Sequence, residues 1–259
     1  MNQCEIVSGK EFYSIQKRPH GNDILYKYSQ HRKKFDIIPG RTIELENMNA
    51  HCLLDDDEND RDVTIMYVPV DQEEEAEEES NKFVLVTLSI VHCQYNRIEN
   101  VEKEYVDTTF NVNEYKIIWN RRSKKIYFFN ENIIHIYSLN YKAFVENLSL
   151  LNTGFEDDTL YTTFNMDIFA ATHDGSNFRL YLLKEAELCW ELYLEQELQL
   201  KTRILKSCYS STELAIILES SGDRLDHIYK FNPDSKALAF FKTTGAMGKY
   251  LFLPEHIHS

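Results

Sequence analysis

A short pattern recurs along the chain: an apolar residue, a tyrosine, any residue and a second apolar residue. Three copies begin at Ile136, Leu180 and Ile228, so they are 44 and 48 residues apart. A fourth copy begins at Leu25, and Leu85–Leu88 is a degenerate copy in the long gap that follows it. We expect each copy to form a short β-strand, because runs of apolar and aromatic residues of this length favour strands.

The residues around each copy predict three further strands. In the last unit, Leu214–Leu218 precedes a turn at Gly222–Asp223, and Ala237–Phe241 follows a turn at Asn232–Ser235. An opening run, Arg203–Cys208, completes four short strands. Short strands with frequent turns indicate an all-β fold, and a four-stranded unit that repeats every ~40–50 residues is typical of a β-propeller blade.

We therefore predict an all-β fold, a β-propeller of about five four-stranded blades in a single domain of residues 1–259. One twisted sheet cannot cover both of its own faces, but neighbouring sheets can do so. An open or partial propeller that needs a partner chain is the rival. The predicted blades span about 1–40, 41–110, 111–152, 153–200 and 201–245. Residues 55–81 would be an acidic insertion, and 246–259, which include apolar Tyr250–Leu253, a closing strand and tail.

Over most of the chain, the units resemble the blades of kelch-like and F-box-associated propellers. Ile228–Pro233 is the best match and Leu180–Trp190 the next: in each, the tyrosine-marked strand precedes a turn and an aromatic fourth strand. The chain departs from the pattern because it has no Gly-Gly doublet, no Trp-Asp dipeptide and no upstream F-box helix. The expected fourth-strand tryptophan appears only as Trp190. The resemblance implies the architecture and no particular ligand.

Most of the net charge of −14 lies in two segments. Asp55–Asp62 contributes −5 and Asp71–Ser80 contributes −7, so the remaining body is nearly neutral. The second segment separates two predicted strands, Val63–Val70 and Lys82–Ile90, and should be a solvated hairpin loop. It is either an inert insertion or a docking arm for a protein partner with a basic segment. The candidate binding residues of this arm are Glu73, Glu74, Glu75, Glu77, Glu78 and Glu79.

Two basic clusters fall on predicted turns and are the other candidate binding residues: Arg32, Lys33 and Lys34, and Arg121, Arg122, Lys124 and Lys125. The first turn joins the third and fourth strands of its blade, and the second joins the first and second strands. Turns of these two kinds project on the same side of a blade, so the clusters can form one positive patch. They are either plain solvated turns or a site for an acidic partner, for RNA with aromatic stacking, or for the chain's own acidic arm.

The sequence has no nucleophile elbow, Walker loop, zinc-protease motif or dinucleotide fingerprint, so we assign no catalytic residue and expect no cofactor. His135 and His227 lie in marked strands and should be structural, with a pocket as the alternative. His173–Asp174 should be a turn pair. His256 and His258 can meet a metal only if the tail is ordered, and a frayed end is expected there, so we predict no metal site.

Five dispersed cysteines favour reduced thiols inside the cell: Cys4, Cys52, Cys93, Cys189 and Cys208. The chain does not begin with a secretory pattern, and no apolar run approaches the roughly 20 residues that span a bilayer. We therefore expect a cytoplasmic or nuclear protein that does not enter a membrane.

Three functions follow, in this order. The first is a non-catalytic scaffold or recognition subunit of a larger complex, favoured by the repeat and the polarised charge. The second is a small propeller enzyme, a hydrolase or lyase acting on a sugar or phosphoester, with an axial site built from loops of several blades. The third is an RNA-binding propeller that uses the two basic turns.

Overall fold

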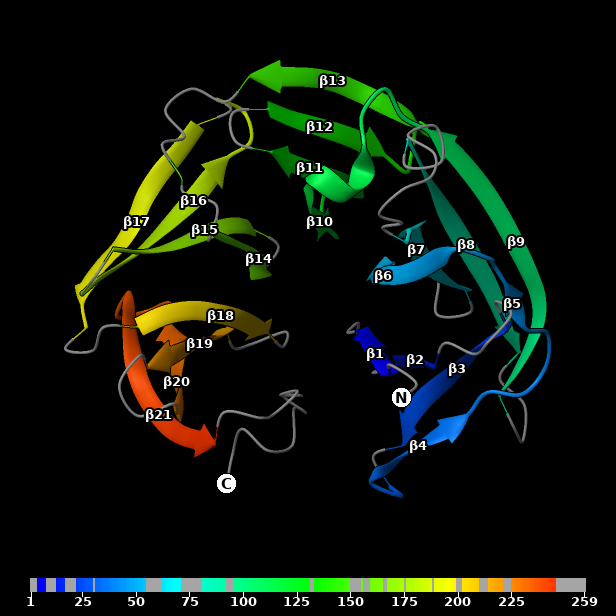
Figure 1. Cartoon of the computed structure of the whole chain (residues 1–259), viewed down its shortest axis with the longest axis horizontal. Coiled ribbons are helices and arrows are strands. Elements are labelled where there is room, and N and C mark those ends of the chain that lie inside the picture. The colour runs from blue at the N-terminus through cyan, green and yellow to red at the C-terminus, as the bar shows by residue number, and fades with distance from the viewer. Residues whose placement is uncertain are drawn as a thin grey trace. The chain divides into compact units, whose positions relative to one another are not determined.

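The computed structural model of the chain is all-β, and its five antiparallel sheets are the blades of a β-propeller (Figure 1). The residues divide into two compact units, Met1–Tyr115 and Lys116–Ser259, and each is described by itself. The structure describes residues 4–7, 13–16, 22–29, 31–54, 62–70, 81–91, 96–130, 133–149, 155, 159–164, 167–174, 176–187, 189–198, 202–209, 214–220 and 225–245.

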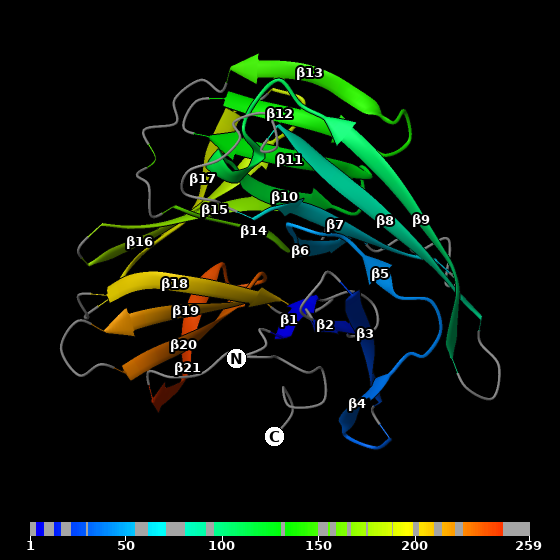
Figure 2. The same ribbon diagram turned by 45° about the vertical axis from the view of Figure 1, so that its right-hand side comes forward.

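The first unit contains blades 1 and 2. Blade 1 is formed by β1 (Cys4–Val7), β2 (Tyr13–Gln16), β3 (Asn22–Ser29) and β4 (Lys34–Ile37), and β5 (Ile43–Glu44) also pairs with β3. Blade 2 is formed by β6 (Met48–Leu54), β7 (Asp62–Pro69), β8 (Lys82–Val91) and β9 (Arg97–Asp107), and the 3-10 helix η2 (Val112–Glu114) follows it. Strand β1 contacts β6, so the first strands of the two blades are neighbours (Figure 2). Because β5 belongs to the first sheet, this sheet extends past the predicted boundary at residue 40.

The second unit contains blades 3, 4 and 5. Blade 3 is formed by β10 (Lys116–Asn120), β11 (Lys125–Asn130), β12 (Ile133–Ser138) and β13 (Ala143–Ser149). Blade 4 is formed by β14 (Leu160–Phe164), β15 (Asp167–Asp174), β16 (Asn177–Lys184) and β17 (Cys189–Glu197). Blade 5 is formed by β18 (Thr202–Tyr209), β19 (Leu214–Ser220), β20 (Leu225–Asn232) and β21 (Ala237–Gly245). Strand β14 contacts both β10 and β18, so the three sheets stand side by side (Figure 1).

Blade 4 shows how neighbouring sheets of this unit cover both faces of a blade. In β15, Ile168 packs into a cluster with blade 3 residues, and the next residue, Phe169, packs into a cluster with blade 5 residues. Successive side chains of a strand point to opposite faces, so both faces of the sheet are covered by neighbouring sheets. This confirms the prediction that neighbouring sheets cover the faces that one sheet cannot cover alone.

The tyrosine-marked segments all lie in the third strand of a blade, as the repeat predicts. Tyr137, Tyr181 and Tyr229 also share a local irregularity: the pairing with the fourth strand shifts by one residue next to each of them. Each shift is a β-bulge, which bends the outer strand and makes it a poorer template for pairing with another chain.

An aromatic cluster joins blades 3 and 4. The ring of Phe129 stacks on Tyr161 with centroids 4.7 Å apart and planes 4° apart, and it lies 5.8 Å from the ring of Trp190. Burial raises the pKa of Tyr161 to about 12. Burial also raises the pKa of Tyr127, and the nearby charge of Glu185 adds to this effect.

These tyrosines predict a loss of stability at high pH. The unfolded chain releases each phenol proton near pH 10, whereas the folded chain retains it, so the stabilisation is complete below about pH 10 and is lost as the pH rises toward the folded pKa. We expect Tyr161→Phe to reduce the slope of the unfolding free energy between about pH 10 and about pH 12 by up to about 1.4 kcal/mol per pH unit. Urea unfolding followed by tryptophan fluorescence measures this. The control is Tyr141→Phe, at a residue 79 % exposed, and equal slopes in the two variants would contradict the prediction.

Candidate functional site

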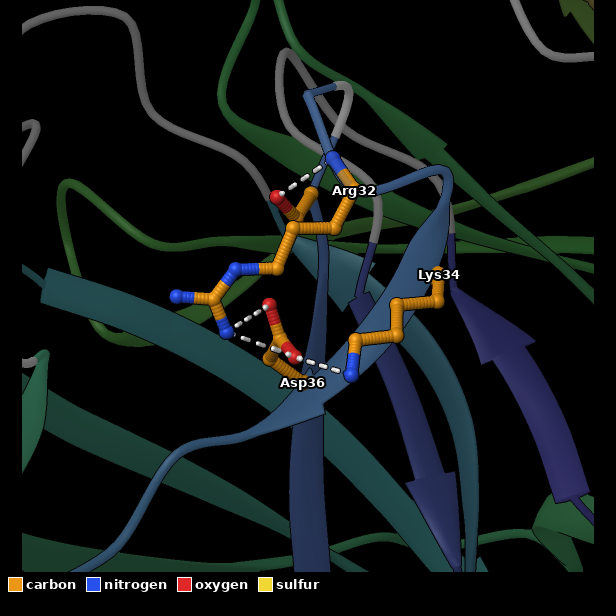
Figure 3. Close-up of polar contacts among 4 residues, drawn as sticks. Arg32, Lys34 and Asp36 are labelled. Carbon is orange, nitrogen blue, oxygen red and sulfur yellow. Dashed lines mark hydrogen bonds and ion pairs between the residues drawn. The ribbon is translucent and has the colours of Figure 1, made fainter.

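The first predicted basic cluster lies at the β3–β4 hairpin turn of blade 1, and its side chains are exposed. Arg32 Nη1 lies 3.3 Å and 3.4 Å from the two carboxylate oxygens of Asp36, and Lys34 Nζ lies 3.7 Å from Asp36 Oδ1 (Figure 3). The backbone N–H of Arg32 donates to Ser29 Oγ, which closes the turn. Asp36 therefore offsets part of the positive charge that the sequence suggested, although exposed ion pairs of this kind contribute only about 0–1 kcal/mol.

The second predicted cluster lies at the β10–β11 turn of blade 3. Asn120 organises this turn, because its Oδ1 accepts the backbone N–H of Arg122 at 3.0 Å and that of Ser123 at 3.4 Å. A side chain that replaces a backbone acceptor in this way favours a tight polar turn. The Arg122 side chain is exposed and the Lys124 side chain is half-buried.

The β12–β13 turn of the same blade lies directly against this basic turn. The backbone N–H of Leu139 donates to the carbonyl of Lys124 at 3.0 Å, which joins the two turns. Tyr141 and Lys142 follow on the outer side of the second turn; Tyr141 is 79 % exposed and Lys142 is exposed. We name the combined surface the basic turn face, and it consists of Arg121, Arg122, Lys124, Tyr141 and Lys142.

An acidic turn adjoins the basic turn face from blade 4. Glu185 and Glu187 lie in the β16–β17 turn, and both side chains are exposed. Asn120 Nδ2 donates to Glu185 Oε1 at 2.8 Å, so the residue that organises the basic turn also holds the acidic turn. We name Glu185 and Glu187 the acidic turn. A basic turn and an acidic turn on adjacent blades of one unit are thus joined through Asn120.

Lysine occupies an unusual backbone conformation in four hairpin turns. Lys33, Lys124, Lys142 and Lys236 have φ values of 51°, 51°, 50° and 48°. This left-handed region is unfavourable for residues with a Cβ and is normally taken by glycine or asparagine. Four different turns therefore keep a cation where glycine would fit the backbone better.

We expect Lys142→Gly to stabilise the chain by about 0.5–1 kcal/mol, because glycine removes the strain at φ 50°. The shift in the midpoint of urea unfolding measures the gain. The matched control is Lys116→Gly in β10, where the backbone is an ordinary strand and glycine should destabilise by a similar amount. Lower stability in both variants would contradict the prediction.

The structure places most of the predicted binding residues. Arg121, Arg122 and Lys124 come together in the basic turn face, and Lys125 is the half-buried first residue of β11. Arg32, Lys33 and Lys34 lie in the other unit, so the single patch formed by both clusters stays a prediction. Glu73, Glu74, Glu75, Glu77, Glu78 and Glu79 lie outside the described residues.

Two members of the basic turn face, Tyr141 and Lys142, were missed by the sequence reasoning. A single lysine in a turn has no signal of its own. The topology of the blade did contain a signal. In a four-stranded antiparallel sheet, the turn between the first two strands and the turn between the last two strands lie at the same end, and both turns were predicted for this blade.

The candidate histidines that the structure describes lie in strands. His135 and His227 lie in the third strands of blades 3 and 5 and are 8 % and 7 % exposed. His173 and Asp174 end β15, whereas His256, His258 and the predicted closing strand lie outside the described residues. Among the residues that the structure describes, three or more potential metal ligands do not come together anywhere. The same described part contains no helix with the length and apolar character needed to cross a membrane.

No protein-family model and no curated protein matches this chain. Several solved structures are similar to it. A protein from Lactobacillus plantarum shares 6 % identity over 90 % of this chain and 68 % of its own, with a TM-score of 0.49. An exo-β-1,3-galactanase from Phanerochaete chrysosporium shares 10 % sequence identity over 92 % of this chain and 62 % of its own, with a TM-score of 0.48. Hsv2 from Kluyveromyces lactis shares 11 % sequence identity over 94 % of this chain and 73 % of its own, with a TM-score of 0.44. Likeness at this level carries no functional argument.

Proposed function

We propose that this chain is a non-catalytic recognition subunit, a β-propeller that binds a partner protein within a larger intracellular complex. One observation carries the proposal: the Leu139–Lys124 hydrogen bond joins two hairpin turns of blade 3, and these turns hold the exposed residues Arg122, Tyr141 and Lys142. Arginine and tyrosine are enriched among the residues that dominate binding energy at protein interfaces.

The rigidity of the blade supports this function. The basic turn face stands on β11 and β12, whose side chains are almost entirely buried. A surface held by packed strands loses little conformational entropy when a partner binds, which favours affinity. The dispersed cysteines and the resemblance to kelch-like and F-box-associated propellers support a cytoplasmic or nuclear adaptor, which is part of the proposal.

The experiment is affinity capture from a native extract, followed by reconstitution with the purified partner. We expect a stoichiometric protein whose binding weakens as salt increases, because charged rims are screened by ions. Arg122→Glu/Lys142→Glu should abolish the capture. The matched control is Arg97→Glu/Lys116→Glu, which makes the same change in charge at exposed strand positions and should retain it.

Two results would overturn the proposal. In the first, the two double variants capture the same proteins equally well. In the second, treatment with ribonuclease removes every captured protein, which would assign the basic turn face to RNA. Circular dichroism of each variant ensures that a lost partner does not reflect a lost fold.

A further inference from the structure

The acidic turn limits what the basic turn face can bind. Glu185 is hydrogen-bonded to Asn120 at the base of the basic turn, and Glu187 follows two residues later in the same turn. We propose that the two surfaces together bind an extended peptide in which a block of acidic residues lies directly next to a basic residue. The acidic block lies on Arg121, Arg122, Lys124 and Lys142, and the basic residue lies on the acidic turn. This inference rests on the proposed function and adds the chemistry of the partner.

Charge complementarity assigns each part of the peptide to one of the two surfaces. The cations belong to two turns of blade 3, whereas the carboxylates belong to the adjacent turn of blade 4, so a ligand that crosses from one blade to the next meets a change of sign. Placing a like charge on either part is unfavourable, and such repulsion is a main source of specificity at interfaces. Tyr141 supplies apolar contact area beside the acidic block.

A nucleic acid fits this surface less well than a peptide. A phosphate backbone carries a negative charge at every nucleotide, so a strand that extended from the basic turn face over blade 4 would place phosphates against Glu185 and Glu187. The whole chain also has a net charge of −14, which opposes a long polyanion but not a short segment of mixed charge.

The lysines in the left-handed conformation connect the inference to the fold. Lys124 and Lys142 both have φ values near +50°, where glycine is preferred, and both belong to the basic turn face. If the lysine side chains do not bind a ligand, replacing them with glycine should leave binding unchanged and should leave stability equal or higher. If they bind the acidic block, Lys142→Gly should make the protein more stable and the binding weaker, a combination that damage to the fold cannot produce.

The test uses the full chain and fluorescence anisotropy with labelled probes. One peptide carries an acidic block followed by a basic residue, a second carries only the acidic block, a third has both charges reversed, and a uridine oligonucleotide is the fourth probe. We expect the first peptide to bind about fivefold more tightly than the second, with no binding of the third. Lys142→Gly should weaken the first peptide several-fold while the midpoint of urea unfolding rises.

Glu185→Gln/Glu187→Gln supplies the decisive variant. Glutamine retains an oxygen that can accept the Asn120 hydrogen bond but carries no charge, so the turn should keep its structure. We expect the first and second peptides to bind this variant equally, because the site for the basic residue has lost its charge. An unchanged preference in the variant, or tighter binding of the oligonucleotide than of any peptide, would overturn the inference. If a captured partner requires Arg122 and Lys142 but none of the peptides binds, this inference fails while the proposed function stands.

Discussion

Replacing Gly40 with alanine should destabilise the first unit by about 3 kcal/mol or more. Gly40 has a φ of +126°, a conformation that residues with a Cβ rarely adopt, and it forms an isolated parallel bridge with Ile98 of β9. The backbone N–H of Ile98 donates to the carbonyl of Pro39 at 2.8 Å, and the N–H of Arg41 donates to the carbonyl of Ile98 at 3.3 Å. The segment between β4 and β5 of blade 1 is thereby fixed to the outer strand of blade 2.

The added methyl group would have no room at this contact. A Cβ on Gly40 would overlap the carbonyl oxygen of Ile98 and lie 2.9 Å from its nitrogen, and these backbone atoms cannot rotate away as a side chain can. The bridge must therefore open or the strand must shift, and Ile98, which is 3 % exposed, would lose its place in the core. The strain of the backbone conformation adds to this cost.

The chain offers a way to locate the effect. Both of its tryptophans, Trp119 and Trp190, belong to the second unit, so tryptophan fluorescence follows that unit whereas far-ultraviolet circular dichroism follows the strands of both. We expect Gly40→Ala to lower the urea midpoint seen by circular dichroism more than that seen by fluorescence. Arg41→Ala is the control, because it keeps the backbone hydrogen bond and removes only an exposed side chain. Equal stability of the two variants would show that the close approach at Gly40 is not rigid.

The sequence predicted the blades because their physics is local. Runs such as Ala215–Leu218 are apolar on both faces and end at polar residues, and this combination favours a buried strand of a repeated sheet. It also predicted that Arg121 and Arg122 lie on a turn, since charged residues between two apolar strands favour a turn that is exposed to solvent. Local reasoning therefore found the third strands and the basic turn between β10 and β11.

What could not be predicted depends on pairing between distant residues. The Asn120–Glu185 hydrogen bond joins residues 65 positions apart, and nothing near Asn120 in the sequence indicates its partner. The bulges beside Tyr181 and Tyr229 are set by how two strands align, so a pattern within one strand does not reveal them. The pairing of β5 with β3 is a further example, because the sequence of a two-residue strand does not indicate which sheet it joins.

Replacing Phe129 with alanine should destabilise the second unit by about 3–5 kcal/mol, the usual cost of removing a fully buried aromatic side chain. Phe129 is 2 % exposed, and its ring contacts Tyr161 of β14 and Trp190 of β17, so it links blade 3 to both the first and the last strand of blade 4. The cavity would open between two β-sheets rather than within one. Neither sheet can collapse into it without breaking its own strand pairing, so little of the loss should be recovered by relaxation.

The position of Trp190 makes this result directly visible. Its fluorescence should change in the folded variant as well as during unfolding, because Phe129 lies 5.8 Å from its ring. Phe240→Ala is the matched control: it makes the same replacement at a ring that is 56 % exposed, and it should cost far less. Phe129→Leu should recover most of the lost stability, since leucine fills much of the same volume. If Phe129→Ala and Phe240→Ala cost the same, the two blades do not depend on this aromatic contact, and the radial packing of sheets does not stabilise this unit.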